Sequence, residues 1–166
     1  AYKDVHRVLL RPGHPDDIFM TNGNGFYTSH DAGETWEHVT DRNFRIGYPD
    51  QLLISPLDDQ MLFMAGSAKS PGDWRTSHHA AATVVRSNDG GRSWEQAARG
   101  LPENMRGNLE AMCLASYPGG FSLFAATTAG EVFASDDAAG SWRLIASGLA
   151  PISKVGHYHP LQATAA

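Results

Sequence analysis

Short apolar segments recur along the chain, and each is bounded by Gly, Pro, Asn or Asp. The segments are rich in β-branched and aromatic residues, which favours β-strands, and none repeats its apolar positions with the period of a helix. They form three repeats of four segments each. The first repeat contains 5–12, 17–21, 26–29 and 35–39, and the second contains 51–56, 61–66, 83–87 and 93–97. The third contains 110–116, 121–127, 131–135 and 141–146. The pattern predicts an all-β chain of three groups of four antiparallel strands, without a helix.

An eight-residue sequence is written three times, each time between the third and fourth segments of a repeat. It reads SHDAGETW at 29–36, SNDGGRSW at 87–94 and, more loosely, SDDAAGSW at 135–142. The copies start 58 and 48 residues apart, a spacing typical of propeller or solenoid repeats. In a tight reversal, aspartate accepts backbone hydrogen bonds and a following glycine adopts positive φ readily. The sequence therefore predicts the same turn three times.

The residues shared by the three copies predict a role in architecture rather than in catalysis or metal binding. We expect the aspartates to make the turns and the tryptophans to pack against the neighbouring repeat. Ala139 stands where a glycine is expected, so we predict a distorted third turn. The predicted structural residues are Asp31, Gly33, Trp36, Asp89, Gly91, Trp94, Asp137 and Trp142.

The pattern SxDxGx(S/T)W between strands resembles the Asp-box, or bacterial neuraminidase repeat, of sialidases, some other glycoside hydrolases and many non-enzymatic β-propellers. The resemblance implies a β-propeller with ligands on the face opposite the Asp-boxes. It implies three four-stranded antiparallel blades in a single segment, 1–166. We expect the blades at about 3–41, 45–100 and 106–150, with 151–166 as the start of a further inner strand or a tail.

Three blades are fewer than the four to eight with which propellers close, so two aromatic-rich faces would stay uncovered. We expect either further blades in a longer protein, which we favour, or a second copy that completes a ring of about six. The chain begins at Ala1 with no charged-then-apolar leader, so we expect that a signal was removed or that the chain is a piece of something longer. No compartment is predicted.

Composition removes several classes of function. The chain has 42% hydrophobic and 19% charged residues, as ordinary globular proteins do, and lacks an apolar run near the roughly 20 residues of a membrane-spanning helix. Its net charge is −5 with scattered basic residues, which excludes a nucleic-acid partner. The single cysteine, Cys113, excludes a disulfide framework and is predicted to be a small buried residue. We predict no cofactor, no membrane contact and no metal, although His157 and His159 could share one face of a strand.

The second repeat carries a long insertion. From Phe63 to Ser87 there are 24 positions, against 10 and 11 in the other repeats. The extra residues, within 67–82, predict a polar loop on the ligand face. Long loops on rigid scaffolds often carry function, although surface insertions are also well tolerated. We consider Trp74, Arg75 and His78 as ligand-binding candidates.

Charged residues also enter the inner strands in register. His6, Asp50 and Glu110 fall at equivalent positions, and we expect Arg45, Arg106 and Lys154 near them in a ring of alternating cations and acids. Arginines placed in this way could clamp a carboxylate or phosphate, although inter-blade loops are also commonly polar for solvation alone. Asp50 and Glu110 are the candidate catalytic carboxylates, and His6, Arg45, Arg106 and Lys154 join the ligand-binding candidates.

Two functions follow. The first is a non-catalytic Asp-box propeller that binds or scaffolds a glycan, a small anion or a protein segment. The second is a fragment of a sialidase-like or other glycoside-hydrolase propeller. NFRIGYP at 43–49 is similar to the sialidase FRIP motif, but it follows an Asp-box and has Gly47 for the proline, so we interpret it as coincidence.

Overall fold

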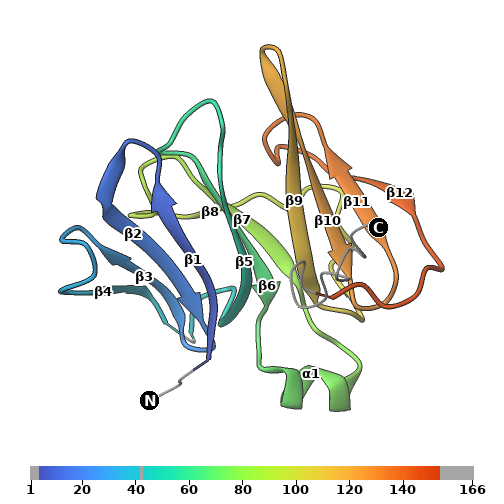
Figure 1. The fold of residues 1–166 in the computed structure, drawn as a ribbon. Coiled ribbons are helices and arrows are strands. Elements are labelled where there is room, and N and C mark those ends of the chain that lie inside the picture. Colours follow the sequence, from blue (N-terminus) through green and yellow to red (C-terminus); the bar gives the residue numbers. More distant parts are fainter. Residues whose placement is uncertain (1–3, 42, 154–166) are drawn as a thin grey trace, which may run out of the picture.

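The computed structural model describes residues 4–41 and 43–153. It contains three four-stranded antiparallel sheets with the strands in sequence order, which confirms the predicted fold class (Figure 1). The first sheet holds β1 (Val5–Arg11), β2 (His14–Asn22), β3 (Gly25–Ser29) and β4 (Glu37–Thr40). The second holds β5 (Tyr48–Ile54), β6 (Leu62–Ser67), β7 (Thr83–Ser87) and β8 (Glu95–Gln96), and the third holds β9 (Leu109–Tyr117), β10 (Gly120–Thr127), β11 (Val132–Ser135) and β12 (Arg143–Ala146).

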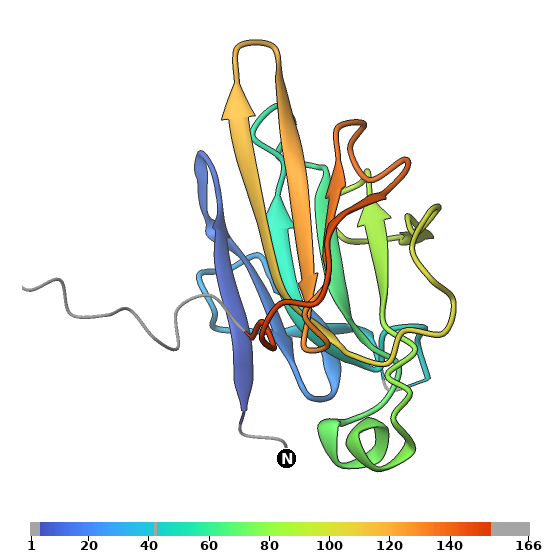
Figure 2. The same cartoon turned by 90° about the vertical axis from the view of Figure 1, so that its right-hand side faces the viewer.

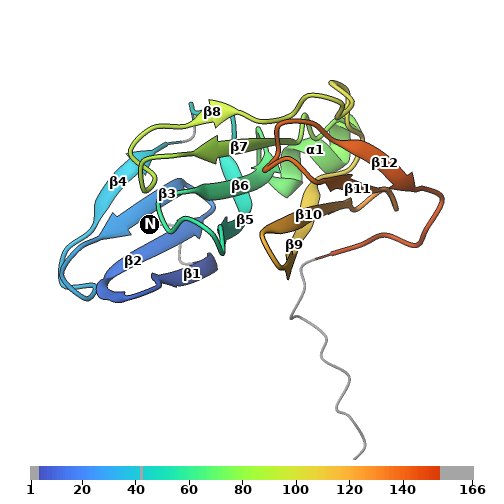
Figure 3. The same ribbon diagram turned by 90° about the horizontal axis from the view of Figure 1, so that it is seen from above.

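The sheets stand side by side and fan out from their first strands. Seen from above, β1, β5 and β9 lie on the inner side and β4, β8 and β12 on the outer side (Figure 3). Each fourth strand leads through a connection to the inner strand of the next sheet. Because the strands are antiparallel, the first and third turns of every sheet share one end, and the second turn and the connections share the other.

The inserted segment contains a helix, so the prediction of an all-loop insertion was wrong. Helix α1 (Pro71–Ser77) starts with proline at its first position, where the missing N–H has no helical partner to lose, and it ends at His78 in the left-handed region at φ 52°. Seven residues with one buried side chain, Trp74, are too few to show a helical period. Helix α1 lies at the end of the sheets opposite the β9–β10 hairpin (Figures 1 and 2).

Each pair of neighbouring sheets encloses its own apolar core. Phe19 and Phe26 of the first sheet pack with Leu52, Leu62 and Met64 of the second. A second cluster joins the second and third sheets and contains Phe63, Ala65, Val84, Met112, Leu123, Phe133 and Trp142. The second sheet buries both of its faces, which explains why 61–66 is apolar at every position instead of alternating.

The repeated turns share one hydrogen-bond pattern. In each turn the aspartate Oδ1 accepts the backbone N–H four residues later at 2.8–2.9 Å, and Oδ2 accepts the hydroxyl of that same residue. The pairs are Asp31 with Thr35, Asp89 with Ser93, and Asp137 with Ser141. The aspartates therefore hold their own turns, as the sequence predicts.

The third turn is not distorted, contrary to the sequence-based expectation. The Ala139 N–H donates to Ser135 Oγ at 3.0 Å, as the Gly91 N–H donates to Ser87 Oγ at 2.8 Å. Ala139 adopts φ 64° and is fully buried in the core between the second and third sheets. Its methyl packing offsets the cost of a left-handed backbone, which is about 1–2 kcal/mol for a residue with a Cβ.

These turns predict a dependence of stability on pH. Hydrogen bonds from Thr35 and Ser93 hold the pKa of Asp31 and of Asp89 at about 2, against 3.8 for a free aspartate. Because the folded-state pKa is depressed, the carboxylates stabilise the fold above pH of about 4, and this contribution is lost as the pH falls toward about 2.

We expect Asp89→Asn to lower the unfolding temperature at neutral pH. We also expect the unfolding temperature of this variant to fall less steeply in acid than that of the wild type, as measured by circular dichroism. Asp16→Asn, at an exposed carboxyl, serves as the control. An acid profile of Asp89→Asn identical to that of the wild type would contradict this role.

Two of the three tryptophans pack against the preceding sheet, as predicted. The ring of Trp94 meets that of Phe26 edge-on at 5.1 Å between centroids. Trp142 is 5% exposed, and its Nε1 donates to Ala97 O at 2.8 Å. Trp36 is 39% exposed and donates to Gly33 O in its own turn. The described residues hold no sheet before the first, so no preceding sheet packs against Trp36.

Cys113 is exposed, so the prediction of a buried residue was wrong. It pairs with Phe124 on β9–β10, on the face of the third sheet that points away from the second. Cys113 lies in an apolar stretch because both faces of this strand carry apolar residues. Within the described residues, another sheet packs against only one of these faces, and Cys113 is on the other.

Candidate functional site

The inner strands carry a buried polar cluster. His6 Nδ1 lies 2.6 Å from Pro49 O and 3.7 Å from Asp50 Oδ1. Because a carbonyl oxygen only accepts, Nδ1 carries the proton in the contact with Pro49. Asn108 Nδ2 donates to Asp50 Oδ2 at 2.5 Å. A residue of β1, a residue of β5 and the residue just before β9 therefore meet at this point, and His6 and Asp50 lie together.

A second chain of contacts crosses the same three strands. Arg7 donates to Gln51 Oε1 through Nε at 3.1 Å and through its terminal nitrogen at 2.8 Å. Gln51 Nε2 donates to Glu110 O at 2.5 Å, and the Glu110 carboxylate accepts from Ser153 Oγ at 2.9 Å. These bonds satisfy polar groups along the inner strands and tie the sheets to one another.

This environment is suited to structure rather than to acid–base catalysis. Asp50 is 1% exposed and Glu110 7% exposed, and neither lines the two clefts described below. A glycosidase needs one carboxyl that reaches the glycosidic oxygen and another that faces the anomeric carbon or a water. Both candidate carboxyls are instead engaged with neighbouring side chains.

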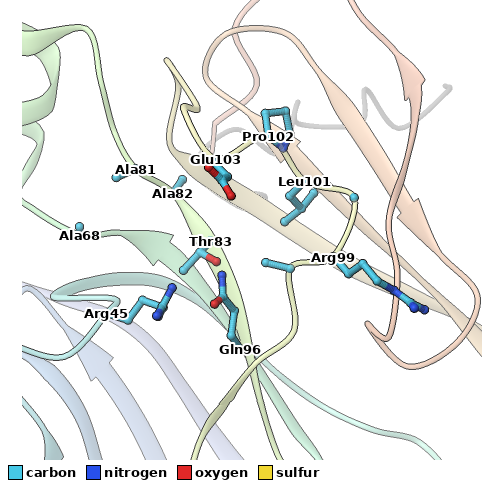
Figure 4. Close-up of a pocket in the computed structure, with 12 residues that line it drawn as sticks. Arg45, Ala68, Ala81, Ala82, Thr83, Gln96, Arg99, Leu101, Pro102 and Glu103 are labelled. Atoms are coloured by element: carbon cyan, nitrogen blue, oxygen red, sulfur yellow. The ribbon is translucent and has the colours of Figure 1, made fainter.

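A cleft of about 710 Å³ lies beside the outer part of the second sheet (Figure 4). Arg45 reaches it from the first connection, Thr83 and Gln96 from β7 and β8, and Glu103 from the second connection. The cleft is far from the inner strands in the order of the sheet, because β8 is the outermost strand. Arg45 therefore does not join His6, Asp50 and Glu110 in a ring.

A smaller cleft, of about 360 Å³, brings several predicted residues together. It is lined by Trp74, His78, Arg106, Gly107, Thr128 and Ala129. Trp74 and His78 come from α1 and its end, Arg106 from the second connection, and Thr128 from the β10–β11 turn. The Arg75 guanidinium lies over the Trp74 ring, 5.4 Å from its centroid. We call this site the α1 cleft.

Trp74 is largely a core residue, which sequence reasoning missed. It is 7% exposed and belongs to the cluster between the second and third sheets. Its indole Nε1 is buried and has no hydrogen-bond partner among the described residues. A buried donor without a partner costs about 1–3 kcal/mol of stability.

The predicted ring of charges is thus divided. His6, Asp50 and Glu110 lie on the inner strands, Arg45 and Arg106 line separate clefts, and Lys154 lies outside the described residues. Gln51 and Asn108 complete the inner cluster but were not predicted, because uncharged amides carry no signal until the strands are adjacent. Gln51 and Asn108 lie close in sequence to Asp50 and Glu110, and this proximity could have indicated that they belong to the same cluster.

Within the described ranges, the side chains form no metal-binding group and no helix is suited to a membrane. Over 4–41 and 43–153, no group of three or more His, Cys, Asp or Glu side chains is arranged to hold a metal ion. His157 and His159 lie outside those ranges. Among the same residues, no helix has the length and apolarity needed to cross a membrane.

Comparison with solved structures identifies the architecture. A crystal structure of an ancestral GH74 enzyme matches with a TM-score of 0.71 and 17% identity, over 89% of this chain and 19% of that chain. YCF48 from Cyanidioschyzon merolae matches with a TM-score of 0.54 and 15% identity, over 85% of this chain and 39% of that one. Both are β-propellers, so the three sheets are blades of a β-propeller. No protein-family model and no curated protein sequence matches the chain.

At these identities the likeness concerns the fold alone. The chain spans less than two fifths of the length of either structure. The activity of a whole propeller therefore does not transfer to this segment.

Proposed function

We propose that the chain is part of an Asp-box β-propeller and acts as a non-catalytic binding module. Three turns with the same aspartate, hydroxyl and backbone contacts support membership of the Asp-box group. In such a propeller the ligand face is the one opposite the Asp-box turns. The second turns and the connections occupy that face here, and they carry the insertion with α1.

The observation that carries the proposal is the α1 cleft. Three of the ligand-binding candidates, Trp74, His78 and Arg106, line one depression although they come from separate segments. Arg75 adds a second guanidinium beside Trp74. The guanidinium of Arg106 in the cleft, with that of Arg75 close to Trp74, offers charged donors suited to an anion.

The ligand that we favour is a carboxylate-bearing glycan. A guanidinium binds a carboxylate through two parallel hydrogen bonds, which fixes its orientation. Glycan chemistry is favoured over a small anion or a protein segment because the repeated turn resembles the Asp-box, which occurs in sialidases and other glycoside hydrolases. The alternative, that the chain belongs to a hydrolase itself, is disfavoured by the burial of Asp50 and Glu110.

Binding of an acidic oligosaccharide tests this proposal. We expect the chain to bind an oligogalacturonate in calorimetric titration and to ignore a neutral cello-oligosaccharide of equal length. Arg106→Ala should weaken binding by about tenfold or more, because a lost charged hydrogen bond costs about 1.5–3 kcal/mol. Arg92→Ala, at an exposed arginine in an Asp-box on the opposite face, should bind as the wild type does.

Three results would contradict the proposal: no binding of oligogalacturonate, equal binding of the neutral oligosaccharide, or equal loss in the two arginine variants. Chromatography of the oligosaccharide after incubation with the chain distinguishes a binding module from a hydrolase. Intact sugar is expected from a binder, whereas shortened products that disappear in Asp50→Asn would favour the hydrolase.

A further inference from the structure

The outermost strand of the second blade is shorter than those of its neighbours. In the first blade, strand pairing extends to Phe26 with Thr40, and the third blade makes the equivalent pair. These pairs join the residue three before the serine of the repeated turn to the residue four after its tryptophan. In the second blade those positions are Val84 and Ala98, and they are not a strand pair because β8 has already ended.

The chain leaves β7 because it bonds to the third blade instead. Trp142 Nε1 donates to Ala97 O at 2.8 Å, and the Trp142 backbone N–H donates to Arg99 O at 2.7 Å. At the junction of the first and second blades, the equivalent indole Nε1, that of Trp94, has no hydrogen-bond partner among the described residues. Strand pairing there continues to Thr40. The segment after Ala97 therefore follows the third blade rather than β7.

This departure leaves an open backbone edge at the start of β7. The Ala97 N–H donates to Val84 O at 3.0 Å, so the backbone groups of Val84 point to the outer edge. Successive residues of a strand turn their N–H and C=O groups to opposite edges, and Thr83 accordingly pairs with Gly66 on the β6 side. The backbone N–H and C=O of Ala82 therefore point outward, and neither bonds to another described residue.

The open edge lines the cleft of about 710 Å³, which we call the edge cleft (Figure 4). Ala82 and Thr83 lie on one side of it and the connection 98–103 on the other. Every lining residue falls within 45–103, in the second blade and the connections beside it. The walls of the edge cleft are thus complete without any blade beyond the first or third sheet. The edge cleft shares no lining residue with the α1 cleft.

The edge cleft carries opposite charges at its two ends. Arg45 lies toward the end marked by Gln96, and Glu103 lies toward the end marked by Ala82 (Figure 4). Both charged side chains are exposed, and neither makes a hydrogen bond or ion pair with a described residue. Arg99, the other cation of the lining, donates to a backbone carbonyl of the third blade at 3.1 Å. Arg45 and Glu103 are therefore the charges that face a ligand.

We propose that the edge cleft binds an extended peptide segment of a partner protein as an added strand of the second blade. The segment lies along β7 where β8 has ended, and its backbone pairs with the N–H and C=O of Ala82. An extended peptide presents N–H and C=O groups at the spacing of a strand, which neither a sugar nor a small anion does. It continues β8 and so runs antiparallel to β7, from Arg45 toward Glu103. An acidic residue near its start and a basic residue near its end match these charges.

Two peptides of equal composition test the direction and the charges. The probe is acetyl-Glu-Val-Thr-Val-Lys-amide, and the control is the same peptide with Glu and Lys exchanged. In an NMR titration of the isotope-labelled chain, we expect the control to bind about tenfold more weakly or less, because it places like charges together. Arg45→Glu should weaken binding of the probe by about the same factor. Arg45→Glu combined with Glu103→Lys should reverse the preference between the two peptides.

A variant of the other cleft keeps this test separate from glycan binding. Arg106→Ala, in the α1 cleft, should bind the probe as the wild type does. No binding of the probe, equal binding of the two peptides, or unchanged binding to Arg45→Glu would overturn the proposal. An equal loss in Arg106→Ala would overturn it as well, because the peptide would then occupy the α1 cleft.

Backbone pairing is measured by amide hydrogen exchange. Exchange of the Ala82 amide should slow by about tenfold or more when the probe saturates the chain, since this N–H gains a partner. The Thr83 amide, which faces β6, should exchange at an unchanged rate. Probes methylated at one inner amide nitrogen at a time should alternate between lost and retained binding, because a strand turns every second amide to its neighbour. Equal tolerance of methylation at every position would refute strand addition. So would protection of Ala82 by oligogalacturonate, or protection that rises with chain concentration when no peptide is present.

Discussion

Trp142→Ala is expected to lower the free energy of unfolding by about 3–5 kcal/mol, the range for large aromatic residues removed from a core. Trp142 is 5% exposed and lies in the cluster between the second and third blades. The variant loses that packing and the hydrogen bond from the indole to Ala97 O. Because the residue joins two blades, we expect the loss to loosen their junction.

Urea denaturation followed by far-UV circular dichroism measures this effect. Trp36→Ala is the matched control, since Trp36 occupies the same position of its own repeated turn and is 39% exposed. The comparison is made at a protein concentration at which sedimentation shows only monomer. We expect Trp36→Ala to cost about 1 kcal/mol, as mostly exposed substitutions do. Equal losses in the two variants would show that the buried tryptophan does not hold the blades together.

Gly91→Ala is expected to cost about 2–5 kcal/mol. Gly91 adopts φ 90°, and a Cβ there would lie 2.7 Å from Phe26 Cε1 of the preceding blade. The left-handed backbone costs about 1–2 kcal/mol with a side chain, and overpacking a core adds about 1–3 kcal/mol. Position 91 therefore requires glycine because Phe26 of the preceding blade leaves no room for a side chain.

Gly33→Ala isolates the two contributions. Gly33 has nearly the same φ, 91°, but its added Cβ would meet Ile18 Cδ1 at an ordinary 3.6 Å. We expect it to cost about 1–2 kcal/mol, from the backbone alone. The same urea series under monomeric conditions measures both variants. A loss at Gly33 as large as the loss at Gly91 would rule out the contact with Phe26 as the cause.

Much of the fold follows from short stretches of sequence. The segment 121–127 becomes β10 (Gly120–Thr127), and 131–135 becomes β11 (Val132–Ser135). The alternation of side chains and the turn residues at both ends are local signals. They therefore predict a strand without knowledge of the strands that lie next to it. The segment 93–97 is shorter than predicted, since β8 is limited to Glu95–Gln96, and outer strands lack a second partner to extend them.

The candidate site was predicted only in pieces. Trp74, His78 and Arg106 were named separately, and folding brings them to one cleft because α1 turns back toward the connection between blades. Arg45 seemed equivalent to Arg106 along the chain, yet it lines another cleft. Positions in connections are poorly aligned by sequence because loops carry no periodic pattern to count along.

The sequence by itself determined the repeating unit: four strands, and a turn in which an aspartate, a hydroxyl and a tryptophan lie within eight residues. Each of those contacts joins near neighbours along the chain, so composition and spacing suffice to specify them. Only the tertiary structure decided that Trp142 is buried and Trp36 exposed, that Cys113 faces outward, and that Asn108 meets Asp50. These outcomes depend on which blade packs against each residue. Contacts between residues tens of positions apart produce no local sequence pattern, so the sequence could not predict them.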